Sequence, residues 1–219
     1  MRSSVLLALC LTFGTSAPGA ELTVLPRADH VDWQAIGRVN VAGYRKREMC
    51  SGVLIGPDRV LTAAHCVSGV DGVGPVPEEF TFVAGWLQGE AKDVVSGSAI
   101  WVHPNAYSEG QLDIRYDIAI LTLERPSTVT PLTVATRTAD APFGIIGYST
   151  RRPHMLSASF DCSRITQDDL LRLDCPVRPG NSGGPVVTRN GDAWGVAGVV
   201  SAMGQTGAIA VPVTRLPPD

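Results

Sequence analysis

Three short segments of the chain carry the side chains that acyl transfer requires. His65 lies in the motif TAAHC, Asp117 begins the motif DIAIL, and Ser182 lies in the motif GNSGGP. A serine hydroxyl is a weak nucleophile until a base accepts its proton, and an imidazole that titrates near neutral pH can act as that base. A carboxylate beside the imidazole would fix its tautomer. These residues are therefore predicted to be the nucleophile (Ser182), the general base (His65) and the orienting carboxylate (Asp117).

Each of these assignments has a simpler alternative. Ser182 could be an incidental serine in a glycine-rich loop, and His65 could be a hydrogen-bonded core histidine. Asp113 is a second candidate for the carboxylate, but a less apolar pair of residues follows it, and we interpret it as a solvated loop residue. The occurrence of all three motifs in one chain favours the catalytic interpretation.

The order of these residues along the chain argues against two other hydrolase folds. Residues 180–184 also match G-x-S-x-G, the nucleophile elbow of α/β-hydrolases, in which the histidine follows the serine. No histidine follows Ser182, because the four histidines are His30, His65, His103 and His154. A subtilisin-like order would have to use Asp29, Asp32 or Asp58, and it needs a parallel sheet with helices. The chain shows few helical patterns.

The elements that must position these residues are predicted to be short β-strands. Runs rich in valine, isoleucine and threonine alternate with turn residues, and the 23 glycines and 16 prolines favour tight turns over long helices. Helix is expected for one turn at 63–67 and near 166–170. Strands are expected at 39–41, 52–55, 59–62, 80–83, 94–102, 118–123, 143–148, 170–174, 185–188, 194–201 and 209–213. The pattern is typical of an all-β sandwich or barrel.

Composition shifts divide the chain into four parts. Residues 1–20 have a charged start, an apolar core at 5–13 and small residues near the end, as a secretory signal peptide has. Residues 21–34 form an N-terminal segment, whose removal as a short propeptide is left open. Two prolines within 124–131 mark a boundary. We expect a first β-barrel over 35–125, with His65 and Asp117, and a second over 126–219, with Ser182.

The motifs TAAHC, DIAIL and GNSGGP, in this order, resemble those of the chymotrypsin-like serine proteases. Asn181 and the lead-in CPVRPG at 175–180 are closest in style to bacterial V8-like peptidases. The resemblance extends from about Gly37 to Val213. It implies an all-β fold of two perpendicular antiparallel β-barrels with the active site in the cleft between them. The backbone N–H groups of Gly180 and Ser182 are expected to form an oxyanion hole.

Two positions depart from the pattern of trypsin. The residue before the nucleophile is Asn181 where zymogen-type members have an aspartate that pairs with a new N-terminal ammonium group. An amide cannot form that ion pair, so activation by such a cleavage is not expected. Pro176 stands six residues before Ser182, where an aspartate would hold a substrate lysine or arginine. Trypsin-like specificity is therefore not expected.

We expect the substrate side chain to contact Pro176, Arg178, Ser201, Ala202 and Met203. These residues favour a small or apolar side chain, with an acidic one, helped by Arg178, as the weaker alternative. The hydroxyl of Ser201 could also contact Asp117, or Ser201 could be an ordinary strand serine.

The cysteine count suggests disulfides. Five cysteines become four once Cys10 is removed with the signal peptide, and four cysteines allow three pairings. The spacing favours Cys50–Cys66 and Cys162–Cys175, and the first pair resembles the family bridge that anchors the turn carrying the base. Free buried thiols are the alternative. No cysteines or histidines have the spacing of a zinc site, so neither a metal nor a cofactor is expected.

These observations together predict an exported serine endopeptidase that works through an acyl-enzyme, located outside the cell or in the periplasm. The net charge of −3 argues against nucleic acid and membrane partners, so the expected partner is a protein or peptide substrate, and the protein is expected to be a monomer. Two alternatives remain: a protease-like binding module with little activity, and a serine esterase on the same fold.

Overall fold

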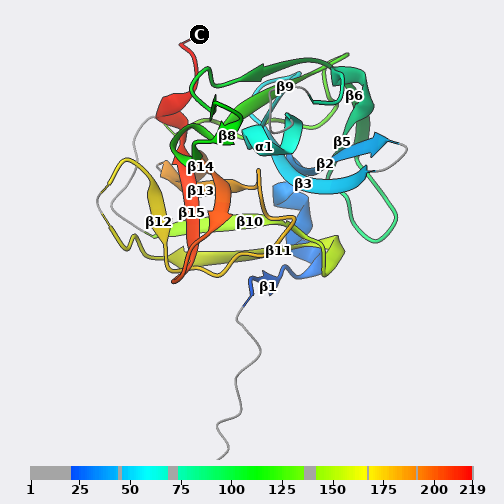
Figure 1. The fold of residues 1–219 in the computed structure, drawn as a ribbon. Coiled ribbons are helices and arrows are strands. Elements are labelled where there is room, and N and C mark those ends of the chain that lie inside the picture. The colour runs from blue at the N-terminus through cyan, green and yellow to red at the C-terminus, as the bar shows by residue number, and fades with distance from the viewer. Residues whose placement is uncertain are drawn as a thin grey trace, which may run out of the picture.

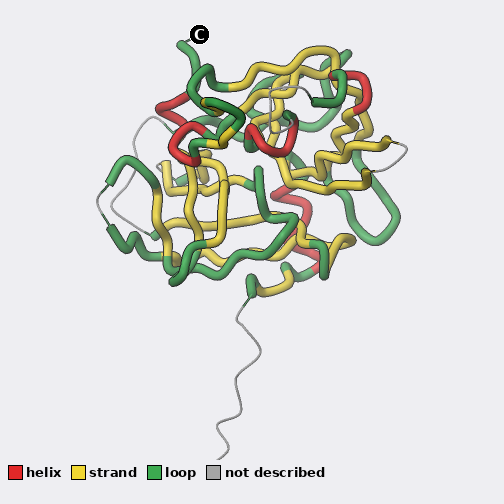
Figure 2. Tube along the Cα trace, viewed as in Figure 1, coloured by secondary structure: helices red, strands yellow, loops and turns green. Residues whose placement is uncertain are grey.

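The computed structural model describes residues 21–43, 46–68, 74–135, 142–166, 168–190 and 192–218, and the predicted signal peptide lies outside them. Strands dominate the described part of the chain, and the helices are short (Figure 2). Figure 1 shows two bodies of β-structure, one built from the earlier strands and one mainly from the later strands. The predicted all-β class is confirmed.

The first body is a closed antiparallel barrel with the strand order β2-β3-β4-β9-β6-β5. Alternate residues point inward, as in β5, where Phe80, Phe82 and Ala84 are buried and the residues between them are partly exposed. Its strands are β2 (Ile36–Gly43), β3 (Lys46–Leu54), β4 (Arg59–Thr62), β5 (Phe80–Ala84), β6 (Asp93–Val102) and β9 (Ala119–Leu123). The connections hold α1 (Ala64–Val67), η2 (Pro77–Glu79), the small pair β7 (Tyr107–Ser108) and β8 (Gln111–Leu112), and η3 (Ile114–Tyr116).

The second body is an antiparallel sheet with the order β1-β11-β10-β13-β14-β15-β12. Its strands are β1 (Thr23–Val24), β10 (Phe143–Ser149), β11 (Arg152–Cys162), β12 (Leu171–Leu173), β13 (Pro185–Asn190), β14 (Ala193–Met203) and β15 (Ala208–Pro212). The 3-10 turns η1 (Arg27–Trp33) and η4 (Val213–Arg215) accompany it.

The strand at one end of this sheet, β12, meets the chain that follows β11, the strand next to the other end. Directly after β11, Arg164 forms a bridge with Leu173 of β12, and the N–H of Ile165 donates to the carbonyl of Arg172 at 2.7 Å. The disulfide between Cys162 and Cys175 joins the same two segments. The sheet therefore curls back on itself as the second barrel.

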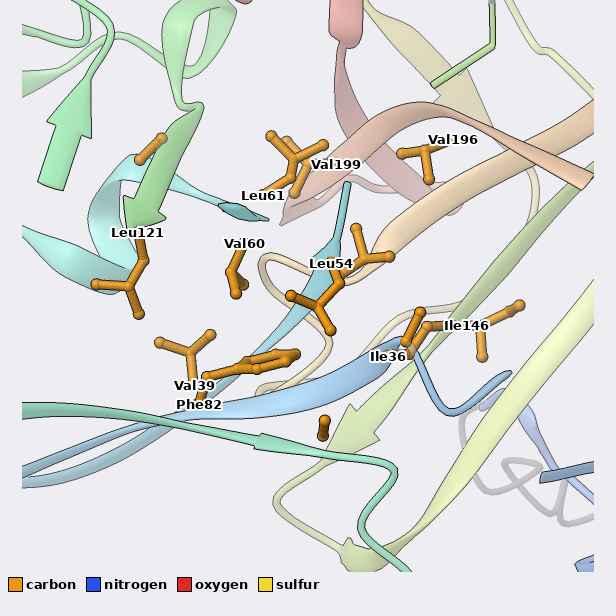
Figure 3. Close-up of a cluster of buried hydrophobic side chains, with 14 of the residues drawn as sticks. Ile36, Val39, Leu54, Val60, Leu61, Phe82, Leu121, Ile146, Val196 and Val199 are labelled. Atoms are coloured by element: carbon orange, nitrogen blue, oxygen red, sulfur yellow. The ribbon is translucent and has the colours of Figure 1, made fainter. Parts of the chain in front are cut away.

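Alternation along the second-body strands separates two apolar clusters. Ile145 and Val186 belong to the cluster inside the second barrel, whereas their chain neighbours Ile146 and Val187 belong to a larger cluster that also fills the first barrel. Figure 3 shows Ile146 close to Ile36 of the first barrel. This shared apolar cluster fixes the two barrels against each other, so residues carried by different barrels hold a defined geometry.

The helix expected near 166–170 does not form in the described part of that segment, which has bends at 168–170. The guanidinium group of Arg164 donates to the carbonyls of Thr166, Asp168 and Leu170 at 2.9, 2.7 and 3.1 Å. These carbonyls would accept backbone N–H groups in a helix, so the arginine replaces the helical hydrogen bonds. The single helical turn expected at 63–67 is present as α1.

Candidate active site

The histidine of the first motif is held by the turn that follows β4. The one-turn helix α1 is too short to be stable alone, and the Cys50–Cys66 disulfide anchors it to β3. The backbone N–H of His65 donates to Oδ1 of Asp117 at 2.9 Å, and its ring Nδ1 lies 2.7 Å from Oδ2 of the same carboxylate. An ionised carboxylate only accepts, so Nδ1 carries the proton and Nε2 is left as the basic nitrogen.

Asp117 is completely buried, with a side chain of 0% exposure. It stands between the 3-10 turn η3 and strand β9, and the buried residue Ile118 fixes its position at the strand entrance. A third donor, the hydroxyl of Ser201 on β14, lies 2.5 Å from Oδ2. A buried carboxylate is stable only when it is hydrogen-bonded, and Asp117 receives donors from both barrels.

Asp113, the other candidate carboxylate, has a different environment. It caps η3 by accepting the N–H of Arg115 at 3.0 Å, and its side chain is 25% exposed. The guanidinium group of Arg115 holds the pKa of this carboxyl below its usual value. The structure thus places Asp117, and not Asp113, against His65.

Ser182 lies in a loop of the second barrel that packs on the first barrel. Its carbonyl accepts the N–H of Ser51 on β3 at 2.8 Å. The next residue, Gly183, has a φ of +78°, and a Cβ there would lie only 2.2 Å from the hydroxyl oxygen of Thr62 and 3.2 Å from the amide nitrogen of Ala63. Only glycine allows this approach, which brings the Ser182 loop to the turn that carries His65.

The peptide groups around Ser182 are oriented through their carbonyls. The Pro179 carbonyl accepts the N–H of Thr150 at 2.9 Å, and the Asn181 carbonyl accepts the N–H of Gly184 at 2.9 Å. In a trans peptide the N–H points opposite to the C=O, so the N–H groups of Gly180 and Ser182 point away from these partners. Within the described residues neither N–H donates to an acceptor. An oxyanion hole needs two N–H groups of this kind.

Asn181 anchors the loop without a charge. Its side chain is nearly fully buried, its Nδ2 donates to the carbonyl of Tyr148 at 2.8 Å, and its Oδ1 accepts the N–H of Arg178 at 2.8 Å. Both ends of the amide therefore have partners inside the second barrel. The ion pair that the sequence argued against is replaced here by two neutral hydrogen bonds.

The residues predicted to contact substrate differ in exposure. Ser201 is buried, and its hydroxyl donates to Asp117. Pro176, Arg178 and Ala202 are half-buried, and Met203 is 63% exposed. Met203 lines a pocket of about 430 Å³. Among the described residues that line this pocket, only Arg172 is charged. Arg172 is paired with Asp168, Nε to Oδ2, at 2.7 Å.

A larger cavity, of about 560 Å³, lies elsewhere. None of its described lining residues was predicted as a site residue. Trp33, Phe160 and Trp194 pack against one another there, with ring centroids 5.4 to 6.2 Å apart.

Both predicted disulfides are present, Cys50–Cys66 and Cys162–Cys175. The sulfur atoms of Cys50 and Cys66 lie within 4.8 Å of a ring nitrogen of His65. Because these sulfurs are bonded to each other, they offer no thiolate to a metal ion, and the cluster does not qualify as a metal site. In the described part of the chain, no helix is long and apolar enough to cross a membrane.

Sequence analysis did not predict Ser51, which lies on β3 and forms hydrogen bonds with residues of the second barrel. Its only sequence signal is its position next to Cys50. The partners of its side chain are 97 and 129 residues away along the chain.

Several known proteins are similar to this chain. The trypsin family model matches residues 27–217. A trypsin from Saccharopolyspora erythraea is 31% identical over 91 residues, which are 41% of this chain and 37% of the relative. Serine protease 23 from Rattus norvegicus is 30% identical over 166 residues, 64% of this chain and 43% of the relative. The chain thus spans about two fifths of the length of these relatives.

Solved structures with similar folds are also proteases. A thermostable serine protease, AL20, from an extremophilic microorganism has a TM-score of 0.70 at 19% identity, covering 83% of this chain and 92% of that protein. The protease Anisep from Arthrobacter nicotinovorans has a TM-score of 0.68 at 19% identity, covering 82% and 90%. The fold is the chymotrypsin-like double β-barrel of serine proteases. The chain belongs to the trypsin family.

Proposed function

We propose that the protein is a serine endopeptidase whose catalytic residues are Ser182, His65 and Asp117. The observation that carries the proposal is the fully buried Asp117 carboxylate, which accepts both the ring Nδ1 and the backbone N–H of His65. This pair of contacts holds the imidazole with Nε2 free of a proton. Only in that tautomer can the ring accept a proton from a serine hydroxyl.

In the proposed reaction the Ser182 oxygen attacks the peptide carbonyl carbon while His65 accepts the hydroxyl proton. The carbonyl oxygen becomes negative, and the N–H groups of Gly180 and Ser182 stabilise it. The C–N bond then breaks, and the proton on His65 goes to the leaving amine. In the second half, His65 activates a water that hydrolyses the Ser182 ester, and the serine regains its proton.

We further propose that this enzyme needs no new N-terminal ammonium group for activity, because Asn181 satisfies its amide within the second barrel. The barrels correspond in this proposal to residues 35–125 and 126–219. Residues 21–34 would stay in the mature enzyme, since Leu25 and Trp33 are buried and β1 pairs with β11. Residues 1–20 would direct export, to the periplasm or the medium, where the two disulfides are stable.

The proposed substrate is a protein or peptide with a small or apolar side chain at the cleavage position. Neither Ser201 nor Met203, two of the proposed contacts, carries a carboxylate that could pair with a substrate cation, and an unpaired cation would be costly to bury. Pro176, Arg178 and Ala202 are the other proposed contacts, and Arg178 could favour an acidic side chain as the weaker alternative.

The test is labelling with a fluorophosphonate probe followed by digestion of a diverse peptide library. The wild-type protein is expected to be labelled on Ser182 and to cleave peptides, and Ser182→Ala is expected to lose both, with a fall in kcat of roughly a millionfold. An unlabelled wild-type protein would support the binding-module alternative. Labelling with hydrolysis of esters but not of peptides would support the esterase alternative.

A further inference from the structure

The hydroxyl of Ser51 links the first barrel to the loop that carries Ser182. Ser51 lies on β3 and is completely buried. Its Oγ donates to the carbonyl of Gly180 at 2.8 Å and accepts the N–H of Tyr148 at 2.9 Å. Its backbone N–H donates to the carbonyl of Ser182 at 2.8 Å. Ser51 therefore contacts both residues whose N–H groups form the proposed oxyanion hole.

The bond to the Gly180 carbonyl is a second restraint on the peptide group between Gly180 and Asn181, whose N–H donates to the carbonyl of Arg178 at 2.9 Å. The neighbouring carbonyls, those of Pro179 and Asn181, are held by backbone N–H groups of their own barrel. The Gly180 carbonyl is instead held by a side chain from the other barrel. Gly180 has a φ of +96° and no Cβ, so its backbone is intrinsically less restricted than that of other residues, and the bond from Ser51 limits the rotation of its carbonyl.

The surroundings are shaped around this hydroxyl. A Cβ on Gly147 would lie 2.9 Å from Ser51 Oγ, and a Cβ on Gly184 would lie 3.3 Å from Ser51 Cβ. Two glycines thus leave the space that Ser51 fills between the barrels. The acceptor and donor roles of the hydroxyl are both used, as expected of a buried polar group that sets a unique arrangement.

We propose that Ser51 is a positioning residue of the oxyanion hole. From the first barrel, its hydroxyl fixes the Gly180 carbonyl, whose peptide group lies between the two that carry the N–H groups of Gly180 and Ser182, so that both N–H groups converge on the substrate carbonyl. The proposal rests on the proposed protease function. Ser51 touches no reacting atom and acts through the loop alone. Its effect should therefore fall on the transition state, in which the oxyanion exists, and not on substrate binding.

The experiment compares Ser51→Ala with Ser127→Ala. Ser127 is a matched control, because its hydroxyl also donates once, to Asp93 at 3.0 Å, and accepts once, from the N–H of Val129 at 3.2 Å, in the segment that connects the two barrels. For each variant, kcat and KM are measured on a peptide selected from the library, together with the second-order rate constant of fluorophosphonate labelling and the melting temperature.

Ser51→Ala is expected to lower kcat and the labelling rate by about 10- to 100-fold, with KM changed by less than about threefold. This is below the hundred- to thousandfold loss that follows removal of an oxyanion donor itself, because the donors remain and only their orientation is relaxed. Ser127→Ala is expected to keep both rates even if its melting temperature falls.

Two results would overturn the proposal: wild-type kcat and labelling in Ser51→Ala, or an equal loss of kcat in Ser127→Ala, which would trace the effect to general stability. A Ser51→Ala protein that did not fold would be replaced by Ser51→Thr, which keeps the hydroxyl and should keep kcat within a few-fold. A Ser51→Thr protein that folded but lost kcat as strongly as expected for alanine would also overturn it. If the wild-type protein itself were not labelled on Ser182, the proposed protease function would be wrong, and the proposed role of Ser51 would be wrong with it.

Discussion

Replacing Asp117 with asparagine separates a catalytic carboxylate from one that is merely buried. The two carboxylate oxygens accept three donors: the N–H of His65, its ring Nδ1–H and the hydroxyl of Ser201. Asparagine has nearly the same shape but offers one oxygen and one NH₂ group. If its oxygen keeps the backbone N–H of His65, its NH₂ group faces Nδ1 and donates to it.

A donor at Nδ1 forces the proton of the neutral imidazole onto Nε2. The ring then cannot accept the proton of Ser182, although its position is unchanged. In enzymes of this class the corresponding change lowers kcat by about 10⁴, which is roughly 5 kcal/mol of transition-state stabilisation. We expect a loss of this size for Asp117→Asn, with KM changed little.

The assay is steady-state hydrolysis of a library-selected peptide, with Asp113→Asn as the control. Asp113 caps η3 and pairs with Arg115 at the surface, so its substitution is expected to leave kcat within a few-fold of wild type. If Asp117→Asn kept more than about a tenth of the activity, or if Asp113→Asn proved the more damaging change, the assignment of the orienting carboxylate would be wrong.

Three further predictions concern stability and specificity. The double variant Cys50→Ala/Cys66→Ala removes a disulfide between cysteines 16 residues apart, and its free energy of unfolding in urea is expected to fall by about 3 kcal/mol. Its kcat is also expected to fall, because the disulfide anchors α1, which carries His65. An unchanged urea midpoint would contradict this. Burial lowers the pKa of His30, so between that lowered value and the ordinary 6.5 the unfolded chain binds more protons, and the urea midpoint should fall as the pH drops through this window. His30→Gln should flatten that slope, and a slope equal to that of wild type would exclude His30 as its source. Peptide profiling should show no strong selection for arginine or lysine at the cleavage position, and such selection would mean that a carboxylate outside the proposed contact residues pairs with the substrate cation.

Local pattern was sufficient for most strands and insufficient for a few. The runs of valine, isoleucine and threonine predicted strands where β4, β5, β6 and β9 form. Strand β11 (Arg152–Cys162) was missed, because Pro153 and His154 near its start and the small residues after them hide the alternation. The expected helix near 166–170 was wrong where the segment is described, because Arg164 takes its carbonyls.

The sequence by itself was enough to nominate the candidate catalytic residues. His65, Asp117 and Ser182 could be named because each lies in a short motif with a recognisable neighbour. A cysteine follows His65, an apolar strand follows Asp117, and glycines follow Ser182. The disulfide pairing was also accessible from spacing. These features depend on residues close together in the chain, so they leave a local signal.

Only the tertiary structure decided which groups hold the site in place. The bond from Ser201 to Asp117 joins residues 84 apart, and the bond from Ser51 to Gly180 joins residues 129 apart. A buried serine on a strand looks the same in sequence whether its hydroxyl meets a carboxylate, a loop carbonyl or nothing. Its partner is set by how two closed barrels pack through a shared apolar cluster, and that packing is a property of the whole chain.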